Sequence, residues 1–208
     1  MVMLALNDAD RARIAEAVRT AEAVTSVEIR LVLAHASGHY REYELIYPAM
    51  LALLAGGVTA AVRPTLGAGW LFIAEAALFA LVAAVLQWPP LRRALVPLPV
   101  KHKAAWRQAR LDYARVGLSS PHTHGVVLLY CSAAEHYVEI LVDDRIAEAL
   151  PAPVWSPIVE QFRNRFATGA IADAFVEAAG ACAAALAPKF PRRPGEANEL
   201  PDGLEELK

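Results

Sequence analysis

The chain has 208 residues, enough for one domain of ordinary size with additional segments. Its formal net charge of -2 favours neither a nucleic acid nor a strongly acidic ligand as partner. The hydrophobic fraction of 56% and the mean hydropathy of +0.32 are high for a soluble protein, and the apolar residues are concentrated in the middle of the chain. The two cysteines, Cys131 and Cys182, form no CxxC motif and are expected to be buried free thiols.

The first 44 residues predict one helix and one strand of a soluble domain. Residues 7–24 have the spacing of an amphipathic helix, with Ile14 and Val18 on its apolar face and Asn7 or Asp8 as its cap. Residues 26–34 (SVEIRLVLA) alternate in the manner of a strand. The apolar start of the chain is too short for a signal peptide, and acidic residues follow at once.

The middle of the chain contains two long apolar runs. Residues 45–62 carry no charge, and residues 65–88 carry only Glu75. Because about 20 helical residues span a hydrocarbon core of ~30 Å, the pattern predicts a transmembrane helical hairpin over residues 45–88. The alternative is a buried helical pair within a soluble α-protein.

A group of basic residues follows the second apolar run, whereas the link between the two runs offers Arg63 alone. The positive-inside rule therefore predicts a two-pass protein of the inner (plasma) membrane, with both soluble portions in the cytoplasm. The same group is expected to attract anionic lipid headgroups at the membrane surface, by about 1 kcal/mol per residue. Its members are Arg92, Arg93, Lys101, Lys103, Arg107 and Arg110.

Glu75 lies about ten residues into the second run, close to the middle of the bilayer at ~1.5 Å per residue. A charge at that depth is costly, so the side chain is expected to face another helix rather than lipid. Gly56 and Gly57 allow close approach on the first helix, and Thr59 offers a hydroxyl. Glu75 is thus predicted to make an intramembrane contact, either within the hairpin or with a second subunit or partner.

The second soluble portion predicts a helix, a β-hairpin and further helices. Pro89, Pro90, Pro97 and Pro99 are expected to stop the membrane helix, and Gly117 to end the helix that follows. The expected elements are helix 101–116, strands 125–133 and 136–144, and helices 144–150, 154–166 and 170–187. The polar, proline-broken tail, residues 188–208, is expected to be extended or partly disordered.

None of the three predicted strands can form a stable sheet alone. The strand before the membrane hairpin and the two strands after it are therefore expected to share one sheet. This arrangement predicts a single α/β domain, made of residues 1–44 and 89–187 and interrupted by the hairpin at residues 45–88.

The order of these elements resembles the TPM-domain family, in particular the bacterial subgroup with an internal transmembrane hairpin. The stretch TSVEI contains a similar Thr-x-x-Glu-Ile strand, and GVVLLYCSAAEHYVEILVDD resembles the strand–turn–strand of the family, with His136 where arginine is usual. Trp155, Gly169 and the ending KFPRRPGEANELPDGLEELK resemble further signatures of the subgroup. The resemblance covers nearly the whole chain and implies a small central β-sheet sandwiched by helices. Relatives have been linked to acid phosphatase activity, calcium binding and assembly of membrane complexes.

The sequence contains none of the motifs GxxxxGK[ST], GxSxG, HExxH and CxxC. Carboxylates at strand ends are the best candidates for a site: Asp143, Asp144 and Glu28 could together hold Ca²⁺ or Mg²⁺ through oxygen. The competing interpretation is that Asp144 caps a helix and Glu28 forms an ion pair. The His122 and His124 pair could contribute to a zinc site only with further ligands, so a polar turn is favoured there.

The absence of a catalytic motif and the tethering hairpin favour a membrane-anchored interaction or accessory module for a membrane complex. Membrane lipids and either a membrane-protein partner or a second copy of the chain are the expected partners. Two alternatives stay open: a metal-dependent phosphatase and a non-catalytic divalent-cation-binding domain. Catalytic residues are not identified by the sequence.

Overall fold

The computed structural model describes residues 6–38, 40–119, 125–192 and 203–207. The chain divides into two compact units. One unit combines Met1–Ser37 with His102–Lys208, and the other is the intervening segment Gly38–Lys101. The inserted unit thus extends beyond the predicted hairpin at residues 45–88 on both sides.

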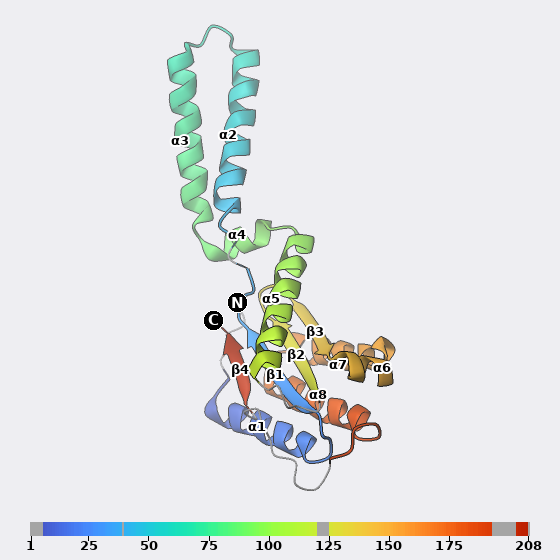
Figure 1. Cartoon of the computed structure of the whole chain (residues 1–208). Helices are drawn as coiled ribbons and strands as arrows, with labels where there is room; N and C mark the ends of the chain where they lie inside the picture. Colours follow the sequence, from blue (N-terminus) through green and yellow to red (C-terminus); the bar gives the residue numbers. More distant parts are fainter. Residues whose placement is uncertain (1–5, 39, 120–124, 193–202, 208) are drawn as a thin grey trace. The chain divides into compact units, whose positions relative to one another are not determined.

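The first unit is a mixed α/β fold built on a four-stranded sheet (Figure 1). Its strands are β1 (Glu28–Ala34), β2 (Val126–Ser132), β3 (Tyr137–Val142) and β4 (Leu204–Leu207), in the order β3-β2-β1-β4. Strand β1 is parallel to both β2 and β4, whereas β3 is antiparallel to β2. Strand β2 is completely buried, as its continuous apolar run predicts.

Helices cover both faces of this sheet (Figure 1). The main core lies on the face covered by α1 (Asp8–Glu22), α6 (Asp144–Ala149), α7 (Ser156–Ala167) and α8 (Ile171–Leu186), with the short 3₁₀ turn η1 (Ala152–Val154) before α7. Helix α5 (Leu98–Ser119) lies over the other face and encloses a much smaller apolar cluster. Asn7 caps α1 as predicted, since its side chain accepts a hydrogen bond from the Asp10 amide at 2.7 Å.

Strand β4 corrects the prediction for the C-terminal tail. Its described part, residues 203–207, is not a loose end but adds a parallel strand to the edge of β1. An ion pair on each face of the sheet holds it. The Arg30 guanidinium lies 2.9 Å from Glu205, and the Arg11 guanidinium lies 2.8 Å from Glu206.

The inserted unit contains α2 (Tyr43–Val62), α3 (Ala68–Leu86) and the short α4 (Pro89–Leu95). Helices α2 and α3 pack against each other as an antiparallel pair and are long and apolar enough to cross a membrane (Figure 1). Within the most apolar 18-residue stretch of each helix, only 17% of α2 and 6% of α3 is buried. Large apolar side chains such as Leu53, Trp70 and Phe72 are about two-thirds or more exposed, at 70%, 73% and 70%.

Helix α3 ends at Leu86, just before the prolines, as predicted, whereas Gly117 does not end the later helix. Pro89 occupies the first turn of α4, where a missing N–H costs nothing because helix N-termini have unpaired donors anyway. Pro99 similarly lies in the first turn of α5. Pro89 and Pro99 therefore also lie where new helices begin. Helix α5 continues through Gly117 to Ser119.

The Phe175→Ala substitution tests the main core. Phe175 is fully buried and packs edge-on against Phe162, with ring centroids 4.9 Å apart. We expect a loss of about 3–5 kcal/mol, measured as faster hydrogen exchange of the β2 amides in the detergent-solubilised full chain. Val24→Ala, at a half-exposed position on the surface, is the control and should change stability by no more than about 0.5 kcal/mol. Unchanged β2 exchange in Phe175→Ala would contradict this packing.

Candidate functional site

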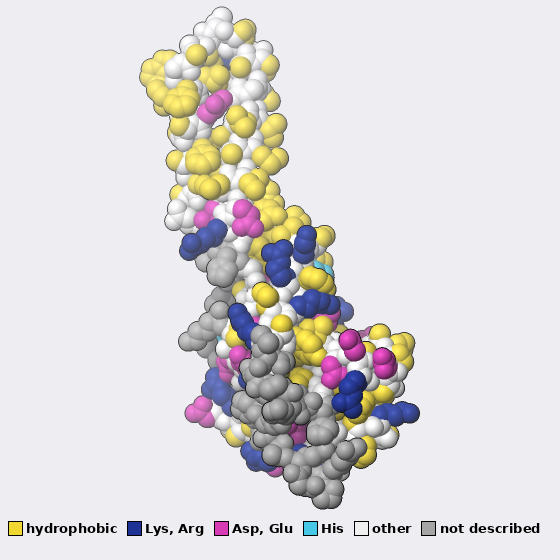
Figure 2. Space-filling view, viewed as in Figure 1, with side chains coloured by type: hydrophobic (Ala, Val, Ile, Leu, Met, Phe, Trp, Pro, Cys, Tyr) yellow, Lys and Arg dark blue, Asp and Glu magenta, His cyan; other side chains and the backbone are white. Residues whose placement is uncertain are grey.

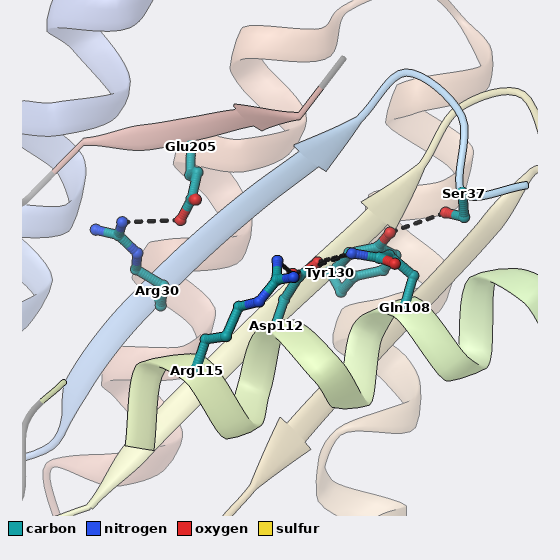
Figure 3. Close-up of polar contacts among 7 residues, drawn as sticks. All are labelled: Arg30, Ser37, Gln108, Asp112, Arg115, Tyr130 and Glu205. Atoms are coloured by element: carbon teal, nitrogen blue, oxygen red, sulfur yellow. Dashed lines mark hydrogen bonds and ion pairs between the residues drawn. The ribbon is translucent and has the colours of Figure 1, made fainter. Parts of the chain in front are cut away.

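The face of the sheet covered by α5 carries most of the buried polar chemistry of the first unit. Its apolar cluster is small and centred on Val32, Leu128 and Tyr130. Alternate residues of β1 and β2 point to this face because side chains alternate along a strand. Polar residues of α5, β1, β2 and β4 meet around that cluster (Figure 3).

Asp112 is the single acidic residue of α5 and is buried, with 6% of its surface exposed. The Gln108 amide donates to its Oδ1 at 3.1 Å, and the Arg115 guanidinium donates to the same oxygen at 2.9 Å (Figure 3). Burial raises the pKa of the Asp112 carboxyl, and the charge of Glu205 acts in the same direction. The bonds from Gln108 and Arg115 oppose that shift.

A second network closes the ends of β1 and β2. The Ser37 hydroxyl lies 2.8 Å from the Tyr130 hydroxyl and 2.6 Å from that of Ser132. The Ser37 amide and the Ser132 hydroxyl both donate to Oε2 of Glu135, which is only 1% exposed. Burial raises the pKa of Tyr130 to about 12. This network fixes the β2–β3 turn to the segment after β1, and its role is structural.

Glu135 was not predicted from the sequence as an anchoring residue. It occupies the turn that joins two apolar strands, where an acid is ordinarily exposed. The following residue, His136, has a positive φ of 52°. The burial of Glu135 depends on Ser37, which lies 98 residues earlier, so no local pattern reveals it.

The three predicted cation ligands lie near the same end of the central strands, where β1 and β2 begin and β3 ends. Glu28 pairs with Val126 at the start of β1, and Asp143 lies against Gly125, where an added Cβ would approach its Oδ2 to 2.5 Å. Asp143, rather than Asp144, caps α6, accepting from the Ile146 amide at 2.8 Å. Within the described ranges, no group of three or more His, Cys, Asp or Glu residues has the geometry of a metal site. The structure therefore gives no support to a Ca²⁺ or Mg²⁺ site at Glu28, Asp143 and Asp144.

The histidines are also dispersed. The ring of His102 contacts that of Tyr137, with centroids 5.7 Å apart, and His136 is exposed on its turn. His122 and His124 lie outside the described residues.

The predicted membrane-surface cations separate into two kinds. Lys103 and Arg107 of α5 are exposed, and Lys101 is half-buried. Arg110 instead forms a bidentate ion pair with Glu139 of β3, at 3.0 and 3.1 Å, and stacks 3.9 Å over the Trp106 ring. Its charge is thus engaged within the first unit. The side chains of Arg92 and Arg93 lie outside the described part.

Within the inserted unit, Glu75 of α3 lies directly against Gly56 of α2. A Cβ added at Gly56 would be 1.4 Å from Oε1 of Glu75, so the carboxyl group occupies the space that any larger residue would need. Gly57 meets nothing within 4 Å, and the Thr59 hydroxyl donates to the Ala55 carbonyl at 2.7 Å rather than to Glu75. Of the three residues expected to receive Glu75, Gly56 is the one that it contacts.

A pocket of about 350 Å³ lies between the start of β3 and the second half of α7. Cys131, Val138 and Phe166 contribute apolar surface to its lining, and the other lining residues are Ser132, His136, Tyr137, Glu160, Arg163, Asn164 and Ala167. Burial raises the pKa of the Cys131 thiol well above its ordinary value, so Cys131 is a poor nucleophile. The Ser132 hydroxyl, another nucleophilic group in the lining, donates a hydrogen bond to Glu135.

The comparisons with known proteins bear on the fold alone. No family model matches the chain, and no curated protein matches it. A solved structure, the NMR structure of BA42 protein from the psychrophilic bacterium Bizionia argentinensis, is similar at 16% identity with a TM-score of 0.60. The match covers 99% of this chain and 98% of that chain. Since identity is this low, the likeness supports the α/β architecture and carries no activity across.

The raised pKa of Asp112 predicts a pH dependence of stability. A carboxyl whose pKa is higher in the folded than in the unfolded chain binds its proton more tightly when folded, so stability falls as pH rises above the ordinary value near 3.8. Asp112→Asn removes this titration, and the parent should therefore lose stability relative to the variant as pH rises from 4 to 7. Thermal unfolding at several pH values measures the difference. Exposed Glu148→Gln is the control, and a parallel shift of both variants would contradict the prediction.

Proposed function

We propose that this chain is a membrane-anchored interaction module, in which the helical pair α2–α3 holds the α/β unit at the cytoplasmic face of a membrane. The exposure of the pair supports the proposal most directly. A helical pair in the core of a soluble protein is mostly buried, but the apolar windows of α2 and α3 are 17% and 6% buried. Apolar side chains cover much of the visible face of these two helices (Figure 2).

The hydrophobic effect supplies the physical reason. Monomeric soluble proteins rarely expose contiguous apolar patches larger than a few hundred Å², and larger patches mark membrane or protein contacts. The two helices, of 20 and 19 residues, have the length that a bilayer requires, and their mean hydropathies are 1.9 and 2.2. Both the length and the outward direction of the apolar side chains therefore favour insertion.

The chemistry of the first unit favours an interaction role over catalysis. Asp112, Glu135 and Glu139 are each held by hydrogen bonds or ion pairs to neighbouring residues. No described group combines an activated nucleophile with cationic groups for a phosphoryl oxygen, so the phosphatase alternative has no observation in its favour. Membership of the TPM-domain family is part of the proposal and depends on the sequence resemblance together with the α/β architecture.

The proposed topology predicts opposite accessibility for two exposed positions. Thr65→Cys lies in the link between α2 and α3, and Lys103→Cys lies on α5. In intact cells, a membrane-impermeant maleimide should label Thr65→Cys at least tenfold more than Lys103→Cys, and lysis should make both reactive. The parent chain is the background control, since Cys131 and Cys182 are buried. Labelling of Lys103→Cys in intact cells, or release of the chain by alkaline carbonate, would refute the topology.

The Glu75 contact predicts a second difference. If the carboxyl also bonds to a helix of a membrane partner, Glu75→Leu should lower partner recovery after mild detergent extraction by about three- to fifteenfold, the effect of losing one interhelical hydrogen bond. Glu75→Gln keeps hydrogen-bonding atoms in the same space and is the matched control. Full partner recovery with Glu75→Leu would confine the contact to the α2–α3 pair.

A further inference from the structure

In the described part of the chain, no strand pairs with the outer edge of β3. Strand β3 is the terminal strand of the order β3-β2-β1-β4 and pairs with β2 along one side (Figure 1). In an antiparallel pair, alternate residues direct their N–H and C=O groups away from the partner strand. Apart from the ladder to β2, the described residues make no backbone hydrogen bond to Tyr137–Val142.

Both faces of β3 are nevertheless fixed. Val138, Ile140 and Val142 pack against the main core. On the other face, the Tyr137 hydroxyl donates to Glu139 at 2.7 Å, and Glu139 holds Arg110 of α5. The strand is therefore a rigid template six residues long, without a proline to block its edge. An edge of this kind readily pairs with another strand.

Near each end of this edge lie polar side chains that form no ion pair with a described residue. Near the start of β3, His136 and Arg163 line the pocket, and neither side chain forms an ion pair with a described residue. Just past the other end, Asp144 is exposed and pairs with no lysine or arginine in the described part of the chain. The strand thus has Arg163 near one end and Asp144 just past the other, and each has an opposite charge beside it, Glu160 and Arg145 respectively.

We propose that the β3 edge is the interface between two copies of this chain, joined by antiparallel β3–β3 pairing into one continuous sheet. Two-fold symmetry places the start of each β3 beside the end of the other. The Arg163 guanidinium then opposes Asp144 of the second copy, twice in the dimer. Arg145, the next residue, provides a cation for Glu160, which also lines the pocket.

A second copy fits this edge better than an unrelated strand does. In a two-fold dimer, the charged residues at one end of each strand face residues of opposite charge at the other end of its copy, so no further sequence is needed for the match. The pocket of about 350 Å³ also gives space for the side chains that follow the end of the opposing strand. The inference rests on the proposed role as an interaction module and names one partner for it.

Cysteine cross-linking in the membrane tests the pairing. Two differently tagged copies of the full chain are co-expressed, one with His136→Cys and the other with Asp144→Cys. The six strand residues between these positions span about 20 Å, at ~3.4 Å per residue, so a disulfide cannot form between the two positions in the same chain. We expect oxidation to link the two tags at least tenfold more efficiently than in the control, which has His136→Cys in both copies.

Charge reversal provides an independent test in chains without introduced cysteines. Arg163→Glu should lower co-purification of the two tagged copies by about fivefold, as expected for losing two exposed ion pairs, and Arg163→Glu with Asp144→Arg should restore it. Equal cross-linking in the mixed and control pairs, or unchanged co-purification with Arg163→Glu, would overturn the proposal. Capture of a different protein by His136→Cys would also overturn it, in favour of a foreign strand. The maleimide topology result is independent of every one of these outcomes.

Discussion

Parallel pairing between β1 and β2 is the constraint on which the arrangement of this chain depends. The ladder extends from Glu28 opposite Val126 to Ala34 opposite Ser132, across more than ninety residues of sequence. Parallel strands require a long crossover, commonly a helix, because the chain must return to the same end of the sheet. Here the crossover contains α5 and the whole inserted unit Gly38–Lys101. An apolar helical pair can therefore be inserted without interrupting the sheet, since the fold already needs a long connection at this point.

The two faces of the sheet differ in their chemistry: one is covered by a large apolar core, and the other by a small apolar cluster with buried polar groups. The face under α1, α7 and α8 contains the large apolar side chains, including the fully buried Phe162 and Phe175. The face under α5 has a smaller apolar cluster. Its buried Glu135 accepts a hydrogen bond from Ser37, 98 residues earlier, and Arg110 of α5 pairs with Glu139 of β3, whereas the donors to the buried Asp112 lie on α5 itself. Buried polar groups of this kind favour one specific arrangement, because any other leaves them unsatisfied. The polar face accordingly fixes α5 and the β2–β3 turn, and it leaves little chemistry available for a substrate.

The sequence predicts those parts of the fold whose signals are local. Helical periodicity identified α1, and apolar runs identified β2, α2 and α3, within a few residues of their bounds. The sequence did not predict β4, because LEEL is short, acidic and embedded in a polar tail. Ion pairs to Arg11 and Arg30, which lie on other elements, stabilise this strand. The same limit explains Glu135 and the three carboxylates proposed as cation ligands. Whether such side chains converge depends on long-range packing, which no spacing reveals. Gly56 is the exception, since a small residue opposite a lone carboxylate indicates close approach directly.

The two edges of the sheet are treated unequally, and this asymmetry follows from the course of the chain. Without the C-terminal strand, β1 would be the terminal strand, and its backbone from Leu31 to Ala34 would be unpaired on one side. The C-terminal segment covers that edge and carries two carboxylates that match the cations beside it. On the other side of the sheet, the described residues add no strand to β3, which has six residues against the four of the terminal strand β4. Natural sheets ordinarily protect their edges, since exposed backbone donors and acceptors invite pairing. An edge that is left open on a rigid strand, with opposite charges at its two ends, is therefore better explained as an interface than as an unprotected surface.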